Sequence, residues 1–108
     1  MKITTLHNLD IGEATDIIKK IQNGEKLPAI HCVDMGEYMK AIEGTHRLLA
    51  YKIADVEPNI IMVDYEENKD TPINDIIKDT DGDNDFSKDD TLGEILESYE
   101  TVGEDLEF

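Results

Sequence analysis

The alternation of apolar and polar positions along the chain predicts a small fold that mixes helices and strands. In residues 11–23, apolar side chains recur at the three- and four-residue spacing of an amphipathic helix, and Gly24 follows as its stop. Residues 59–63 form an apolar run that is typical of a buried strand. Further strands are expected at 2–6, 28–33 and 37–42, with a tight turn at 34–36, and further helices at 47–54, 72–78 and 92–99. Residues 101–108 are expected to be frayed.

The length of 108 residues allows one domain with a modest core, and the order of elements predicts an α/β (α+β) fold with a mixed sheet and packed helices. No stretch approaches the roughly 20 apolar residues of a membrane span, so no membrane association is expected. The N-terminal residues lack the apolar segment of a signal peptide. Cys32 is the single cysteine, which cannot form an internal disulfide. These features predict a cytoplasmic protein.

The net charge of −16 is distributed unevenly. Residues 1–63 carry nine acidic and seven basic side chains, whereas 64–108 carry 17 acidic side chains and three lysines. This change in composition predicts a domain at 1–66 and an acidic extension with short helices at 67–108. Direct DNA binding is not expected, because neutralising phosphates requires Lys and Arg and the chain has one arginine.

The segment 38–51 carries the strongest chemical signal. It is expected to run as a strand to Gly44 and then to turn into a helix, with His46 and Arg47 in the first helical turn. The start of a helix leaves backbone N–H groups without intrahelical partners and carries the positive end of the dipole, so it suits an anion. A guanidinium at this place adds a planar, two-pronged donor for phosphate. An ordinary strand–turn–helix junction, with Thr45 as its cap, is the competing interpretation.

This segment and its surroundings, from about residue 11 to 65, resemble the ParB/sulfiredoxin superfamily. ParB-like domains carry an acidic residue, Gly, a variable residue, His-Arg and then Leu-x-Ala, which stands here as Glu43-Gly44-Thr45-His46-Arg47-Leu48-Leu49-Ala50. The resemblance implies a small α/β fold that binds nucleotide phosphates, with magnesium, through Gly44, Thr45, His46 and Arg47. It leaves Glu43 as the candidate catalytic residue, which would hold magnesium or orient Arg47.

The same resemblance also sets limits on the chemistry. Sulfiredoxins carry a cysteine nucleophile at the position of Thr45, so sulfiredoxin-type chemistry is not expected. Partition ParB proteins bind CTP and continue into DNA-binding and dimerisation domains, whereas this chain continues into an acidic segment. Free-serine kinases of the superfamily use ATP or ADP, but the residues here give no match to their base. Whether the chain is an enzyme stays open at this point.

A second motif lies in the acidic segment 79–90, which is similar to the twelve-residue calcium loop of EF-hands and dockerins. Calcium prefers six to eight oxygen ligands on a loop that curls around it. The final ligand would be Asp rather than Glu, and a solvated acidic loop is the competing interpretation. The candidate calcium ligands are Asp79, Asp81, Asp83, Asp85 and Asp90.

A third interpretation treats the acidic half as a surface. Carboxylates on short helices can imitate the phosphates of nucleic acid and occupy the basic surface of a protein partner. The chain would then be a non-catalytic interaction protein, of a type found in phages and mobile elements. The leading prediction is nevertheless nucleotide or phosphate-ester binding at residues 43–47.

Overall fold

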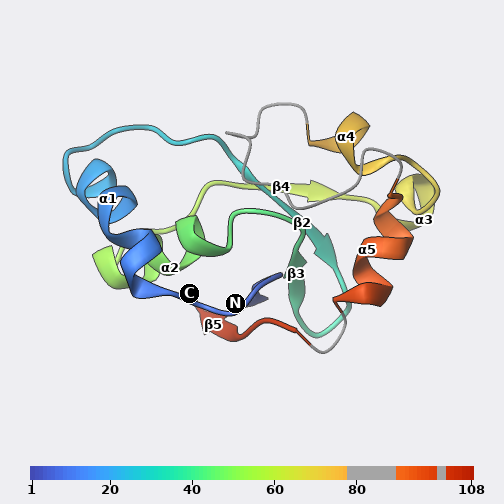
Figure 1. Cartoon of the computed structure of the whole chain (residues 1–108), viewed down its shortest axis with the longest axis horizontal. Coiled ribbons are helices and arrows are strands. Elements are labelled where there is room, and N and C mark those ends of the chain that lie inside the picture. The colour runs from blue at the N-terminus through green and yellow to red at the C-terminus, as the bar shows by residue number, and fades with distance from the viewer. Residues whose placement is uncertain (78–89, 100–101) are drawn as a thin grey trace.

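The computed structural model describes residues 1–77, 90–99 and 102–108, which form an α+β fold around a mixed sheet (Figure 1). The helices are α1 (Ile11–Gln22), α2 (Thr45–Ala54), α3 (Tyr65–Asn68), α4 (Ile73–Ile76) and α5 (Leu92–Ser98). The strands are β1 (Lys2–Thr4), β2 (Ile30–Asp34), β3 (Met39–Ala41), β4 (Ile60–Val63) and β5 (Asp105–Glu107). The predicted α+β class is therefore confirmed.

The five strands form one sheet in the order β4-β2-β3-β1-β5. The central strands β2 and β3 are antiparallel neighbours, as expected for strands joined by a tight turn. The remaining pairings are β2 with β4 and β1 with β3, both parallel, and β1 with β5, which is antiparallel. Parallel pairing requires a crossover connection, and α1 and α2 lie within these two connections.

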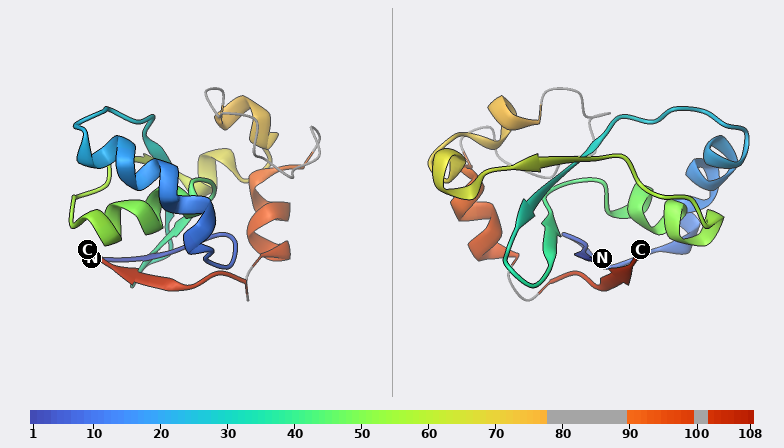
Figure 2. Two further views of the ribbon diagram at one scale, coloured as in Figure 1. Left: turned by 60° about the vertical axis from the view of Figure 1, so that its left-hand side comes forward. Right: turned by 180° about the vertical axis from the view of Figure 1, so that it is seen from behind.

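Helices cover both faces of the sheet, and the described residues form two hydrophobic cores (Figures 1 and 2). In the α1–α2 core, Ile30 and Cys32 from β2 pack with side chains of α1 and α2. In the α4–α5 core, the next residue of β2, Val33, packs with side chains of α4 and α5. This alternation follows from the two-residue period of a strand.

The boundary predicted at residue 66 falls inside the α4–α5 core. Leu6 and Val33 precede that boundary, whereas Ile73, Leu92 and Ile95 follow it, and all five side chains belong to this one cluster. The acidic C-terminal part therefore packs against the sheet through its apolar residues. Its short helices at 72–78 and 92–99 were predicted, and α4 and α5 lie within those ranges. The additional helix α3 is capped by Asp64, whose side chain accepts a hydrogen bond from the Glu67 N–H.

The expectation that residues 101–108 are frayed is wrong for the part that the structure describes. Strand β5 pairs with β1 along its whole length, and the backbones of Met1 and Phe108 exchange two hydrogen bonds of 2.8 and 2.9 Å. Long-range pairing fixes this segment, although its own sequence has little strand propensity. The two ends of the described chain consequently lie side by side (Figure 1).

The segment before β5 is tied to the sheet by a buried amine. Lys40 of β3 is 4% exposed, and its Nζ donates to the carbonyl oxygens of Thr5 and Val102 at 2.8 Å each. Burial lowers the pKa of this amine, and the negative charge of Asp105 acts in the opposite direction. Lys40 thus joins β1, β3 and the C-terminal segment at one point.

Close packing of Gly103 provides a test of this arrangement. Gly103 has φ +99°, and a Cβ added there would lie 1.8 Å from the Thr5 carbonyl oxygen. We predict that Gly103→Ala lowers the free energy of unfolding by about 2 kcal/mol or more beyond the effect of Gly36→Ala, because alanine there overpacks the contact. Gly36 is the matched control, since it has φ +102° and open space around it. Equal losses in urea unfolding would contradict the packing of residues 102–108 on β1.

Candidate functional site

The predicted phosphate loop is a sharp junction between β3 and α2. Gly44 takes the left-handed conformation, with φ 71° and ψ 29°, and is the N-cap of α2. A Cβ at this position would also lie 3.0 Å from Cγ1 of Ile30, so both conformation and space favour glycine. Helix α2 starts at Thr45, two residues earlier than predicted, and the Leu48 N–H donates to the Gly44 carbonyl at 2.9 Å.

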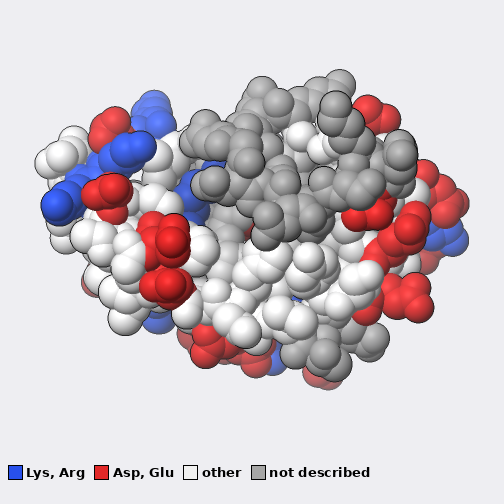
Figure 3. All heavy atoms as spheres, in the orientation of Figure 1, with Lys and Arg blue, Asp and Glu red and all other residues white. Residues whose placement is uncertain are grey.

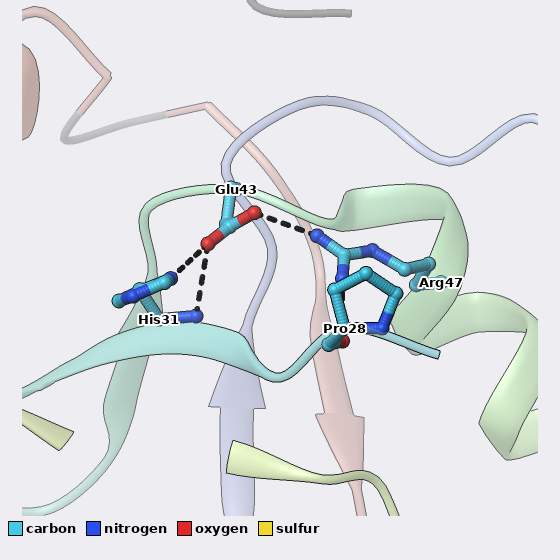
Figure 4. A network of polar contacts seen from close by, with 4 residues as sticks. All are labelled: Pro28, His31, Glu43 and Arg47. Atoms are coloured by element: carbon cyan, nitrogen blue, oxygen red, sulfur yellow. Dashed lines mark hydrogen bonds and ion pairs between the residues drawn. The ribbon is translucent and has the colours of Figure 1, made fainter. Parts of the chain in front are cut away.

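Glu43, immediately before this glycine, is a buried carboxylate that links two elements. Its side chain is 3% exposed. One oxygen, Oε2, accepts from the backbone N–H of His31 at 3.3 Å and also contacts Nδ1 of the His31 ring. The other oxygen, Oε1, accepts from Nη2 of Arg47 at 2.6 Å (Figure 4). Both oxygens of the buried carboxylate are therefore hydrogen-bonded, as a buried charge requires.

Arg47 is fixed from two sides. Its Nη2 binds Glu43, and its Nη1 donates to the carbonyl oxygen of Pro28 at 2.6 Å, on the segment that leads into β2. The arginine side chain is 16% exposed. Of the two sequence-based roles for Glu43, holding magnesium or orienting Arg47, the second describes its geometry (Figure 4). The guanidinium is consequently held beside the start of α2.

The remaining predicted residues of the loop have different surroundings. Thr45 is buried, and its Oγ1 accepts a hydrogen bond from the His7 N–H at 3.1 Å, so its side chain anchors the loop to the N-terminal segment. His46 is half-buried in the first turn of α2. Gly44 makes no side-chain capping bond, and the first turn of α2 contains no acidic residue. Among the described residues, the N–H groups at the start of this helix therefore have no side-chain cap, and the neighbouring Glu43 carboxylate is bonded to Arg47 and His31.

His31 is the site residue that sequence reasoning missed. A lone histidine on a predicted strand carries no ligand spacing, but the predicted β2–β3 turn contained the necessary signal. In the antiparallel register Cys32 faces Ala41, and the Ile42 N–H donates to the His31 carbonyl at 3.0 Å. One residue beyond the His31–Ile42 pair, the same register places Glu43 opposite Ile30, at the start of β2.

Cys32, next to His31, is a buried thiol in the α1–α2 core. Burial raises its pKa from the ordinary 9.0 to about 12, and the negative charge of Glu43 adds to the effect. A thiol with such a pKa is protonated near neutral pH and is a poor nucleophile. Cysteine chemistry at this site is therefore disfavoured.

Most of the predicted calcium loop lies outside the described residues. Of its candidate ligands only Asp90 is described, and its carbonyl oxygen accepts from the Ile73 N–H at 2.7 Å. Among residues 1–77, 90–99 and 102–108, no three His, Cys, Asp or Glu side chains gather as a metal site would require. Calcium binding by Asp79, Asp81, Asp83, Asp85 and Asp90 stays a prediction.

A separate open cavity of about 240 Å³ lies between the end of α2 and β5. It contains none of the residues 43–47. Lys52 crosses one side of it, where its Nζ donates to the Glu107 carbonyl and lies 5.7 Å from the centre of the Phe108 ring. The cavity is lined by Tyr51, Lys52, Asp55, Val56, Glu57, Glu107 and Phe108.

Comparison with models of protein families, with curated proteins and with solved structures found no match. The resemblance to the ParB/sulfiredoxin superfamily therefore rests on residues 43–50 and their surroundings and stays a prediction. The α+β fold itself is established by the arrangement of its own strands and helices. None of the described helices is long and apolar enough to cross a membrane.

The buried carboxylate leads to a stability prediction. Replacing Glu43 by Gln leaves Arg47 and His31 without their anionic partner, so we expect the free energy of unfolding to fall by about 3 kcal/mol. Glu37→Gln is the control, because Glu37 is an exposed glutamate on the β2–β3 turn. Urea unfolding of the two variants measures the difference. A loss equal to that of the control would show that the Glu43 contacts contribute nothing to stability.

Cys32 leads to a prediction about pH. Between pH 9 and 12 the folded chain keeps a proton on the thiol that the unfolded chain loses, so stability falls as the pH rises. The loss contributed by Cys32 should approach about 1.4 kcal/mol per pH unit. Urea unfolding from pH 8 upward should therefore show a less negative slope for Cys32→Ala than for the native chain. Identical slopes would contradict the raised pKa.

Proposed function

We propose that the chain binds the phosphate group of a nucleotide or a related phosphate ester at the start of α2. The observation that carries this proposal is the fixed position of Arg47 beside a helix start that lacks a side-chain cap. The resemblance of residues 43–50 to the ParB-like motif supports the same ligand. Glu43 acts by positioning Arg47, and direct contact with phosphate belongs to the backbone around Gly44 and to Arg47.

The donors at this site suit a phosphate oxygen. The N–H groups of the first turn of α2 and the positive end of its dipole attract an anion. A guanidinium has five N–H donors, and the contacts with Glu43 and Pro28 use one on each terminal nitrogen. His46, in the same turn, adds a further candidate donor. Since Glu43 balances the charge of Arg47, hydrogen-bond geometry contributes more to recognition than net charge does.

The proposal concerns binding and includes no reaction. Thr45 stands where sulfiredoxins carry their nucleophile, and the Cys32 thiol is buried. Magnesium would arrive with the nucleotide and be coordinated by its phosphates and water, because both oxygens of Glu43 already accept hydrogen bonds. Transfer or hydrolysis would require a base for which no residue is proposed.

A second function, binding of a protein partner with a basic surface, is favoured by the acidic side of the molecule. Red side chains gather on the side where α3 and α5 lie (Figure 3). Such a surface speeds association with a positively charged partner and makes binding sensitive to salt. The exposed acidic residues on and around α3, α4 and α5 include Asp64, Glu66, Glu67, Asp70, Asp75, Glu94 and Glu97.

Substitution of Arg47 tests the phosphate site. We expect ATP or CTP with magnesium to raise the Tm of the native chain by mass action. Arg47→Lys keeps a positive charge beside Glu43 but loses the planar fork, so the nucleotide Kd should rise at least about tenfold. Lys20→Ala, which changes an exposed cation on α1, should leave the Kd unchanged.

Calorimetric titration of the three proteins measures the Kd, and circular dichroism checks that each variant is folded. If no nucleotide shifts the Tm or produces heat, the proposal is wrong. The same conclusion follows if Arg47→Lys binds nucleotide as tightly as the native chain.

A further inference from the structure

Strand β4 forms one edge of the sheet, and its backbone groups divide between two sides. The Ile30 N–H donates to the Asn59 carbonyl at 2.8 Å, and the parallel register pairs Ile30 with Ile60 and Cys32 with Met62. In a parallel ladder this register turns the N–H and C=O groups of Ile61 towards β2. The N–H and C=O groups of Ile60 and Met62 therefore point away from the sheet, and no strand among the described residues pairs with that side.

The side chains of β4 add apolar surface to this open edge. Ile61 is 46% exposed and Met62 is 50% exposed, on opposite faces of the strand. In the view from behind, β4 lies nearer to the viewer than its neighbour β2 (Figure 2, right). The strand Ile60–Val63 contains neither a charged residue nor a proline, which are two of the features that usually protect an edge from pairing.

The opposite edge of the sheet is built differently. Strand β5 has the sequence Asp-Leu-Glu, and both of its acidic side chains are exposed. Charged side chains on a short strand discourage pairing with another chain. One edge of this sheet is therefore protected by charge, whereas the other presents backbone donors, backbone acceptors and apolar side chains together.

We propose that β4 is a docking edge for an extended segment of a partner protein, and that basic residues flank this segment. The partner would add a strand through the outward N–H and C=O groups of Ile60 and Met62, while its apolar side chains pack beside Ile61 and Met62. The charge of its flanks follows from the two ends of β4. Glu57 lies before the strand, and Asp64 and Glu66 follow it, all of them exposed.

The same charges disfavour a second copy of this chain as the occupant. Antiparallel pairing of two β4 strands about a twofold axis would bring Asp64 of one copy near Glu57 of the other, at both ends of the ladder. Like charges placed opposite one another destabilise strand pairing. Each copy also carries a net charge of −16, so association of two copies is opposed over a longer range. The proposal does not depend on phosphate binding by Arg47.

Peptide titration of the full chain tests the charge preference. The probes are nonapeptides with a five-residue core of alternating Val, Ile and Thr, flanked either by two Lys or Arg residues or by two Asp or Glu residues on each side. We expect basic-flanked peptides to shift the amide resonances of Ile60 and Met62, and acidic-flanked peptides to bind at least tenfold more weakly. Failure of all basic-flanked peptides to bind at millimolar concentration would overturn the proposal, as would equal binding of both kinds.

Two substitutions at Met62 separate backbone pairing from apolar contact. Met62→Pro removes the outward N–H but leaves the bonds to β2, so the chain should stay folded and lose at least tenfold in peptide affinity. Met62→Thr keeps that N–H and should retain more of the affinity than Met62→Pro does. Equal affinities for the two folded variants, or concentration-dependent dimerisation through β4 in place of peptide binding, would contradict the proposal.

Discussion

Burial of the Glu43 carboxylate is the constraint on which the candidate site depends. A buried carboxylate must find hydrogen-bond donors, and those of Glu43 come from His31 on β2 and Arg47 on α2. Arg47 in turn reaches back to the Pro28 carbonyl. The strand, the turn and the helix are therefore positioned relative to one another by one charged group. The left-handed conformation of Gly44 makes this possible, because it starts the helix directly after the glutamate.

Much of the fold could be predicted because most of its elements have a local signal. The apolar period of α1 and the apolar run of β4 reflect burial that each segment achieves with its own side chains. Strand β5 could not be found in this way. Its sequence has one apolar residue, Leu106, between two acidic ones, and its conformation depends on β1 and on the close approach of Gly103 to Thr5. The change in composition predicted a boundary at residue 66, whereas the α4–α5 core contains side chains from both sides of that boundary.

The candidate site was predicted in part, for a related reason. Gly44 and Arg47 belong to one continuous segment, so their spacing marks a strand–turn–helix junction. The contacts of Arg47 with Pro28 and of Glu43 with His31 join residues 19 and 12 positions apart. Those contacts depend on strand register, which a single sequence specifies only through its turns. The hydrogen bond from the His7 N–H to Thr45 also joins distant segments, so it could not be predicted from the sequence either.

The pairing of β1 with β5 has a consequence for the order in which parts of the chain fold. Thr4 faces Asp105, so this side of β1 stays uncovered until β5, 101 residues further along the chain, has been synthesised. Closing so long a loop costs entropy before its contacts form, and folds with many distant contacts fold slowly. During translation the nascent chain can form α1 and the β2–β3 hairpin early, while β1 keeps an open backbone edge. The pairing of β1 with β5 therefore forms after the β2–β3 hairpin.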